Sequence, residues 1–446
     1  MSQHPIPSRA CRRLLAAVGA CAVLGGPEMA LAGVQDARSM ALGGARQAVS
    51  DSASTVWAAP ALLGFEAPHG VLLSFPAAVS AGVGNDFLGF KGIDSLLGGQ
   101  ALSDADIASL LSSLPASGLG LQVQGGLSSA IALPALRSGV FVRGHADTYG
   151  LAIPRDLVAL LLGGNELTPS LRVDTLQGAR AEAYADAGLS VALPVPLSLF
   201  RNASLGLTGR YLRGLWMGRV SEARGSLVSL ADDGTVSGDA RARWQVAGNG
   251  GQGWALDTQL AVDLRDDLRL TTHISNFGAM TWSKVQDRLV AFQVPATQPF
   301  TFENGQFTSN LGELQNPGRF VSETAQGLDG QDLTETLPLV YGVGLAWTGP
   351  VRWLPFSVFA DAEVGQGRGF GASPVPRLRA GLELKPFSFL PLRVGYGAGG
   401  EQPTWFSAGF GLDVPFWRLD AAVVAQDGMF GAARGAMYAL SSQLQF

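Results

Sequence analysis

A histidine, a serine and an asparagine follow one another closely at His273, Ser275 and Asn276. On a strand, residues two apart face the same side, so His273 and Ser275 could serve as base and nucleophile. If the strand lies in a membrane, a lipid-cleaving enzyme would need His273 and Ser275 on the face that contacts lipid. The apolar Leu270 and Ile274 lie on that face instead. We therefore expect His273 and Ser275 to face inward, and we predict no catalytic residue and no enzyme.

His145 and Asp147 form a second pair with the same spacing. A metal site would need a third ligand, which the surrounding sequence does not offer, so a hydrogen-bonded pair is the favoured interpretation. The glycine-rich stretches 248–253 and 365–371 lack the Lys-Ser/Thr ending of a phosphate-binding loop. We predict neither a metal nor a cofactor.

We expect these side chains to lie on β-strands, because apolar residues recur at every second position. In 404–414, Phe406, Phe410 and Val414 share one face, while Ser407 and Asp413 share the other. The mean hydropathy is +0.21, and no apolar run beyond the N-terminal peptide approaches the roughly 20 residues of a membrane helix. A membrane β-barrel is a fold that reconciles these properties.

The connections between strands are of two alternating kinds. Short turns that contain proline and apolar or aromatic residues alternate with longer glycine-rich or polar loops, which is typical of the two ends of an outer-membrane barrel. The alternation predicts fourteen antiparallel strands over 70–91, 119–132, 137–149, 178–192, 203–214, 253–264, 267–280, 338–348, 355–366, 375–385, 390–399, 404–414, 416–426 and 436–446. The long loops include 215–252 and 281–337.

Two short helices are expected within the long loops. Ser103 and Asp104 precede apolar residues at helical spacing in 103–114, and 154–163 begins at a proline and ends at Gly163. Their apolar faces could cover the barrel mouth or pack against neighbouring loop residues.

The inward face predicted by the alternation carries charges of both signs. Paired charges inside a barrel form a structural network more often than they line an ion-selective channel, so we expect an occluded lumen. The predicted lumen network comprises Arg143, His145, Asp147, Arg180, Glu182, Arg210, Asp257, Arg269, His273 and Glu383.

The first 32 residues have the features of a secretory signal peptide. A basic region at Arg9, Arg12 and Arg13 precedes an apolar region and a small-residue cleavage site at 30–32. Cleavage before Cys21, as in a lipoprotein, is the alternative. Loss of three arginines and one glutamate with this peptide would change the formal net charge from −5 to −7. This balance argues against a nucleic-acid partner.

The last strand ends on an aromatic residue. Tyr438, Leu440, Leu444 and Phe446 share one face, which Ser442 alone interrupts with a polar group. This pattern resembles the C-terminal signal recognised by the outer-membrane barrel assembly machinery, so we predict that the strand targets the chain to the bacterial outer membrane and its lipid. An edge strand of a soluble β-protein is the alternative interpretation.

Residues 36–65 resemble the N-terminal motif of the FadL-type long-chain fatty-acid transporter superfamily of outer-membrane barrels. The matching residues are Arg38, Met40, Gly43, Gly44, Ala45, Asp51, Ser54 and Pro60-Ala61-Leu62, whereas Ala59 replaces the expected asparagine. Residues 275–282 are more similar to an uncharacterised, TraF-like branch of this superfamily. The resemblance implies a domain division into a signal peptide (1–32), an N-terminal plug (33–68) and a barrel (69–446), with Gly43, Gly44, Asp51 and Pro60 shaping the plug.

The resemblance also implies a function, namely passive transport of small hydrophobic, fatty-acid-like molecules across the outer membrane. In this hypothesis a ligand is captured on the long-loop side and displaces the plug. The alternative is a non-transporting surface or biogenesis scaffold that binds a partner protein through loops 215–252 and 281–337.

Overall fold

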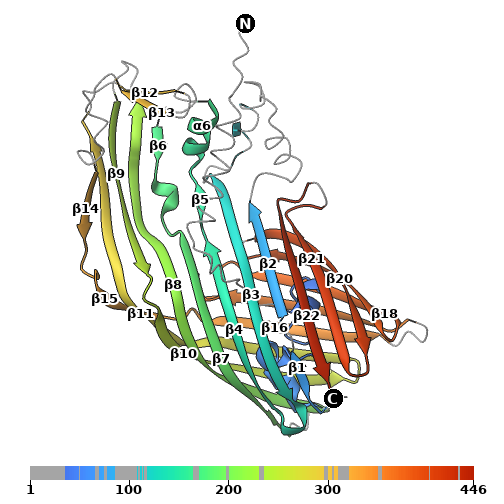
Figure 1. The fold of residues 1–446 in the computed structure, drawn as a ribbon. Coiled ribbons are helices and arrows are strands. Elements are labelled where there is room, and N and C mark those ends of the chain that lie inside the picture. Colours follow the sequence, from blue (N-terminus) through green and yellow to red (C-terminus); the bar gives the residue numbers. More distant parts are fainter. Residues whose placement is uncertain are drawn as a thin grey trace.

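The computed structural model describes residues 36–49, 51–65, 70–74, 78–85, 108, 111–112, 114, 118–163, 170–196, 200–230, 236–295, 300–303, 306–309, 321–349, 354–400, 402–429 and 432–446. Its main element is the closed antiparallel barrel of 14 strands that the sequence predicts (Figure 1). The barrel strands are β1 with β2 (Leu72–Ser74, Ala78–Asn85), β3 (Leu119–Leu133), β4 (Ser138–Tyr149), β7 (Arg180–Pro194), β8 (Asn202–Leu230), β10 (Gly251–Arg265), β11 (Leu268–Val294), β16 (Val340–Gly349), β17 (Phe356–Gly365), β18 (Arg377–Phe387), β19 (Leu390–Gly399), β20 (Gln402–Val414), β21 (Trp417–Gln426) and β22 (Gly435–Gln445).

The barrel closes where β22 pairs with the first strand. Val79 lies opposite Leu440 and Leu72 lies opposite Gln445, while β1 and β2 also pair with β3 on their other side. The first strand is described in two parts, β1 and β2, and residues 75–77 between them lie outside the described part of the chain. Residues 86–91 of the predicted strand lie outside the described part of the chain.

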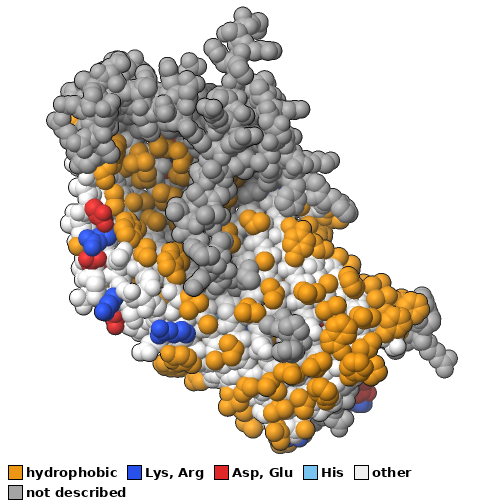
Figure 2. All heavy atoms as spheres, viewed as in Figure 1, with side chains coloured by type: hydrophobic (Ala, Val, Ile, Leu, Met, Phe, Trp, Pro, Cys, Tyr) orange, Lys and Arg blue, Asp and Glu red, His pale blue; other side chains and the backbone are white. Residues whose placement is uncertain are grey.

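The outer wall is apolar over most of its height. Large hydrophobic side chains are exposed on all sides, for example Val142 on β4, Val394 on β19 and Leu440 on β22. Figure 2 shows hydrophobic side chains over much of the visible face of the barrel, most densely at the lower right, with most of the visible charged side chains at the left. Such an apolar surface is suited to contact with lipid, whereas the surface of a soluble protein is suited to contact with water. Within the described ranges, no helix is both long and apolar enough to cross a membrane.

The predicted long loops 215–252 and 281–337 are largely β-structure, contrary to the sequence analysis. β8 has 29 residues and β11 has 27, far more than the roughly 10 that a membrane strand needs. β10 begins at Gly251. Beyond that level, β9 (Val236–Ala247) takes the place of β10 between β8 and β11 and pairs with both strands. β14 (Val321–Ala325) and β15 (Gln331–Thr336) continue this sheet, which we call the β-extension and which rises above the barrel in Figure 1.

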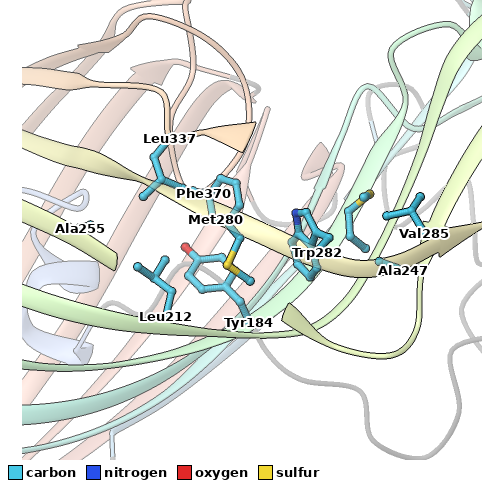
Figure 3. Packing of buried hydrophobic residues seen from close by; sticks show 10 residues of the cluster. Tyr184, Leu212, Ala247, Ala255, Met280, Trp282, Val285, Leu337 and Phe370 are labelled. Carbon is cyan, nitrogen blue, oxygen red and sulfur yellow. The ribbon is translucent and has the colours of Figure 1, made fainter. Parts of the chain in front are cut away.

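A buried apolar cluster joins the β-extension to the barrel. Trp282, Met280 and Met217 are fully buried there, and Phe370 reaches the cluster from the loop between β17 and β18. Figure 3 shows Tyr184 and Leu337 completing the packing around these side chains. The cluster combines side chains from β7, β8, β9, β10 and β11.

The remaining described elements are short. They are α2 (Ala37–Ala41), α3 (Thr55–Ala58), α6 (Arg155–Gly163), the 3-10 helices η1 (Pro60–Gly64), η2 (Pro134–Leu136) and η4 (Asp174–Leu176), and the strands β5 (Ala152–Ile153), β6 (Ser170–Arg172), β12 (Phe300–Glu303) and β13 (Gln306–Ser309).

The helix predicted over 154–163 is present as α6. The one predicted over 103–114 lies mostly outside the described residues. Of that segment, Leu111 and Leu114 pack against Val158 and Ala159 of α6, which places these apolar side chains against other loop residues.

Candidate functional site

The N-terminal segment, residues 36–49 and 51–65, packs against the inward-facing side of the barrel wall. Asp36 caps α2 by accepting a hydrogen bond from the Ser39 amide at 2.8 Å. α2 contacts β19 to β22, α3 contacts β3, β4 and β7, and η1 contacts β7, β8 and β10. These helices have four or five residues, so their stability comes from the wall that surrounds them.

Side chains of the wall satisfy the backbone of this irregular segment. The Ser407 hydroxyl accepts a hydrogen bond from the Gly43 amide at 2.9 Å and donates one to the Ala41 carbonyl at 3.0 Å. The Gln443 side chain accepts one from the Ala53 amide at 2.7 Å. Gln259 likewise binds backbone atoms of Gln47 and Ala61. Buried backbone groups need such partners, which explains polar side chains at these inward positions.

A buried ionic cluster ties the segment to the short-turn half of the barrel. Arg38 donates to both carboxylate oxygens of Glu383, at 3.0 and 3.1 Å, and Arg393 donates to the same carboxylate at 2.6 Å. Burial alone would lower the pKa of the Arg38 guanidinium, but the adjoining Glu383 carboxylate raises it above its ordinary value. Arg38 therefore stays charged. Arg418 of the neighbouring strand donates to the Asp51 carbonyl at 3.0 Å.

Asp186 is the centre of a second cluster, on the opposite wall. It accepts two hydrogen bonds from Arg143, at 2.9 and 2.5 Å, and one from Arg210 at 3.0 Å. Arg210 also pairs with Asp257 at 2.7 Å, and His145 Nε2 lies 3.5 Å from Asp186. Each guanidinium thus has at least one carboxylate beside it, which offsets the cost of burying the charge.

The remaining predicted lumen residues are divided between two places. Arg180 bridges Glu182 and Glu335 at 2.7 and 2.9 Å near the β-extension. Arg269 lies at the short-turn end, where it pairs with Asp263 at 2.7 Å and covers the ring of Phe65 at 4.2 Å.

A cavity of about 210 Å³ lies between the N-terminal segment and the wall. The segment contributes Gly44, Gln47, Trp57 and Pro60, among others, to its lining. The wall contributes predicted residues that include His145, Asp147, Arg210, Asp257, His273 and Ser275, together with Tyr149, Tyr184 and Phe370. His145 and Tyr184 stack with ring centroids 4.5 Å apart. The cavity therefore has aromatic side chains beside many polar ones.

The candidate catalytic residues His273 and Ser275 lie on β11, and His273 Nδ1 has no hydrogen-bond partner within the described part of the chain. His273 and Ser275 both line the cavity and so face inward, as predicted. Asn276 also lines the cavity, and its backbone has a left-handed conformation (φ 68°). Its side chain accepts a hydrogen bond from Arg210 at 2.7 Å, and its amide donates to Asp257 at 2.8 Å. Asn276 thus belongs to the ionic cluster around Arg210.

The residues predicted to shape the plug and to direct assembly lie in separate regions. Gly43 and Gly44 form the turn after α2, and Pro60 begins η1. On β22, Tyr438 and Leu440 are exposed on the outer wall, as is Phe446 just beyond it, and Leu444 is half-buried there. Ser442, the one polar residue on this face, accepts a hydrogen bond from the Trp417 indole at 2.8 Å.

Several residues of the site were not predicted from the sequence. Gln47, Tyr149, Tyr184 and Phe370 line the cavity, and Glu335 pairs with Arg180. Tyr184 shares the inward face with the predicted Glu182, so the alternation contained a signal for it. Phe370 follows Gly369 in a loop that folds back into the barrel, and no periodic pattern marks such a return.

The comparisons with known proteins found similarity in structure rather than in sequence. No family model matches the chain, and no curated protein does. Among solved structures, the TodX monoaromatic hydrocarbon channel deltaS2 mutant has a TM-score of 0.50 at 12% identity, over 92% of this chain and 99% of that one. The deltaS2S3 mutant of the same channel gives 0.50 at 10% identity, over 92% and 98%. The toluene transporter TodX of Pseudomonas putida gives 0.47 at 10% identity, over 93% and 98%.

The structure defines the class of protein. A closed barrel of 14 antiparallel strands with an apolar outer wall is a bacterial outer-membrane β-barrel. Solved structures of the TodX hydrocarbon channel share this fold, so the barrel fold expected from the resemblance of residues 36–65 is confirmed.

Proposed function

We propose that this barrel allows small hydrophobic molecules to cross the outer membrane passively. The observation that carries the proposal is the combination of a closed barrel with a cavity of about 210 Å³ that the N-terminal segment bounds on one side. The proteins that share the fold are described as monoaromatic hydrocarbon channels, which supports the same class of cargo here. A passive route needs no cofactor and no catalytic step.

In this proposal the N-terminal segment acts as a plug. It is held by hydrogen bonds from individual wall side chains such as Ser407, Gln443 and Gln259 rather than by a β-ladder. Each such bond contributes only about 0.5–1.5 kcal/mol net, so the segment can exchange partners without unfolding the barrel. The buried pair of Arg38 and Glu383 is the strongest single restraint on it.

Uptake measurements test the proposal. Cells with and without the gene are exposed to a panel of labelled hydrocarbons and fatty acids, and gene-dependent uptake of at least one compound is expected. Ser275→Trp, which places an indole in the cavity, should return uptake to the background. Thr272→Trp places the same side chain on the exposed outer face of β11 and is the matched control. Identical uptake with and without the gene across the panel would refute the proposal.

A scaffold function is the second candidate, because the β-extension rises well above the barrel and a passive route does not require it. β14 is exposed along its whole length and could bind a partner protein. Stoichiometric recovery of one protein with the full chain, lost on removal of residues 300–325, would favour this function. Lipase or protease turnover by the purified barrel would contradict both candidates.

A further inference from the structure

The lining of the interior cavity is more polar than a plain hydrocarbon requires. Besides its aromatic side chains, the cavity is lined by Gln47, Asp147 and His273, each of which has a buried polar atom without a partner among the described residues. A ligand without hydrogen-bonding groups would leave such side chains without partners, at a cost of about 1–3 kcal/mol for each. The lining therefore distinguishes between a hydrocarbon and a molecule of the same shape that carries a hydroxyl group.

Two deeply buried side chains in this lining have polar atoms without a protein partner. Gln47 is 1% exposed, and among the described residues neither its Nε2 nor its Oε1 has a hydrogen-bond partner. Asp147 is 8% exposed, and its Oδ2 has no partner within the same part of the chain. Native proteins pair nearly all buried polar atoms, so these atoms indicate that the cavity holds a hydrogen-bonding molecule.

The unpartnered atoms include both donors and acceptors. Gln47 Nε2 can donate, whereas Gln47 Oε1 and Asp147 Oδ2 can accept. His273 Nδ1 is also unpartnered within the described chain and faces the same point of the wall, since a methyl group on Gly342 would lie 2.8 Å from it and 2.6 Å from Gln47 Nε2. A hydroxyl group, which donates and accepts at once, matches this mixture.

Apart from Asp147, the charged groups described around the cavity are paired with opposite charges, which favours a neutral ligand. Arg143 and Arg210 bind Asp186 and Asp257, and Arg379 donates to Glu363 at 2.5 Å. An ionic ligand would have to compete with these partners after losing its own water. A neutral ligand meets no such cost.

We infer that the cavity is a binding site for a neutral, hydroxylated single-ring molecule of the phenol class. The lining offers aromatic side chains to the ring, among them Tyr184 and Phe370. Its hydroxyl group can pair with the unpartnered atoms of Gln47 and His273, which lie beside the same point of the wall, or with that of Asp147. The volume of about 210 Å³ corresponds to about seven water molecules, or to one such ring. The inference rests on the proposed function in one respect, since the ligand is taken to be cargo of the barrel.

Binding of p-cresol and toluene to the purified full-length barrel in detergent tests this site, because the two molecules differ by one hydroxyl group. Calorimetry should show that p-cresol binds about tenfold or more tightly than toluene, the ratio that one hydrogen-bonded hydroxyl provides. Equal affinity for both, or binding of neither, would overturn the inference.

Variants test whether the preference for p-cresol over toluene arises in the cavity. Gln47→Met keeps the length of the side chain, removes both unpartnered atoms and leaves the backbone bonds to Asp361 and Gln259 in place, so it should abolish the preference for p-cresol. Asp147→Asn is the second variant and should reduce the preference. Gln252→Met, the same change on the exposed outer face of β10, is the control. Heat-modifiable migration in gels confirms that each barrel is folded. An unchanged preference in both cavity variants would overturn the assignment.

The two proposals fail in distinguishable ways. If p-cresol binds with the expected preference but the gene does not increase its uptake, the site stands and passive transport fails. If toluene uptake depends on the gene but toluene and p-cresol bind equally, transport stands and recognition of the hydroxyl group fails.

Discussion

Arg38 donates two hydrogen bonds to the carboxylate of Glu383, although 345 residues separate them in the chain. Both side chains are at most 5% exposed, and Arg393 donates to the same carboxylate from β19. Glu383 therefore pairs with two guanidinium groups, one from the N-terminal segment and one from the wall. It links the segment to the barrel more firmly than any single backbone contact does.

Replacing Glu383 with glutamine should loosen the N-terminal segment. The change leaves Arg38 buried without its carboxylate, which typically costs about 3–5 kcal/mol. Denaturant unfolding in detergent should show this loss, and protease should cut within residues 36–65 more rapidly. Glu323→Gln, in an exposed pair with Arg288 at 3.8 Å, should change stability by less than about 1 kcal/mol. Equal effects of the two variants would contradict the role of the buried pair.

Gly43 is expected to be intolerant of alanine for two separate reasons. Its φ is +71°, and a Cβ atom there would lie 2.5 Å from the Tyr396 carbonyl oxygen and 2.8 Å from that of Ala380. Both atoms belong to barrel backbone and cannot move aside. Gly43→Ala should therefore displace the turn after α2 and increase amide exchange in residues 36–49.

The Gly330→Ala variant separates the effect of backbone strain from the effect of close contact with the barrel backbone. Gly330 has φ +75° but nothing lies within 4 Å of the added atom. Only the backbone strain of about 1–2 kcal/mol should appear there. If Gly43→Ala costs no more than Gly330→Ala, the close approach to the wall does not matter.

The barrel could be predicted from the sequence because its environment imposes one simple rule. Lipid outside and polar groups inside force alternation on every spanning strand, and the turns mark the strand ends. The predicted strand 390–399 agrees with β19 (Leu390–Gly399), and 416–426 agrees with β21 (Trp417–Gln426) to within one residue. The count of fourteen followed from the same alternation.

The β-extension could not be predicted because the same rule does not act on it. β14 is exposed at every position and β15 at most of its positions, so neither strand has an apolar face that would create a period of two. The N-terminal segment lacks a signal for a different reason. Its helices have four or five residues, which is too short for helical periodicity to be recognised.

The sequence predicts which side chains of the candidate site face inward, but not which residues they contact. Alternation assigns Arg210 and Asp257 to the lumen face, but the register between strands decides which partners they meet. Asn276 joins them only because an irregularity in the pairing of β10 with β11, near Leu256 and Thr258, turns its side chain. Register and bulges depend on long-range pairing, which a single sequence does not reveal.

The stability of the β-extension should depend on Asp287. This carboxylate is fully buried and accepts hydrogen bonds from Arg243 at 2.8 and 2.5 Å and from the Leu328 amide at 3.3 Å. Asp287→Ala removes all three bonds and should increase amide exchange in residues 285–295 and 321–336 by more than about tenfold. Heat-modifiable migration of the barrel should be unchanged.

Arg241→Ala is the control for Asp287, because Arg241 is half-exposed in its pair with Glu222. It should leave exchange in these ranges nearly unchanged. If loss of Asp287 also abolished the folded barrel, the β-extension would be an integral part of the barrel rather than an addition to it.

The ring of Phe446 should be needed for assembly more than for the stability of the finished barrel. Its amide donates to the Val71 carbonyl at 2.9 Å, and its carbonyl accepts from the Gly70 amide at 2.7 Å, so Phe446→Ser keeps the backbone closure and removes only the exposed ring. Most of the variant should accumulate in a protease-sensitive form outside the membrane. The fraction that does assemble should unfold at nearly the wild-type denaturant concentration. Phe389→Ser removes an aromatic ring of similar exposure from the same end of the barrel. Because Phe389 is not part of the last strand, that variant should assemble normally, and equal assembly defects in the two variants would show that the end of β22 carries no special signal.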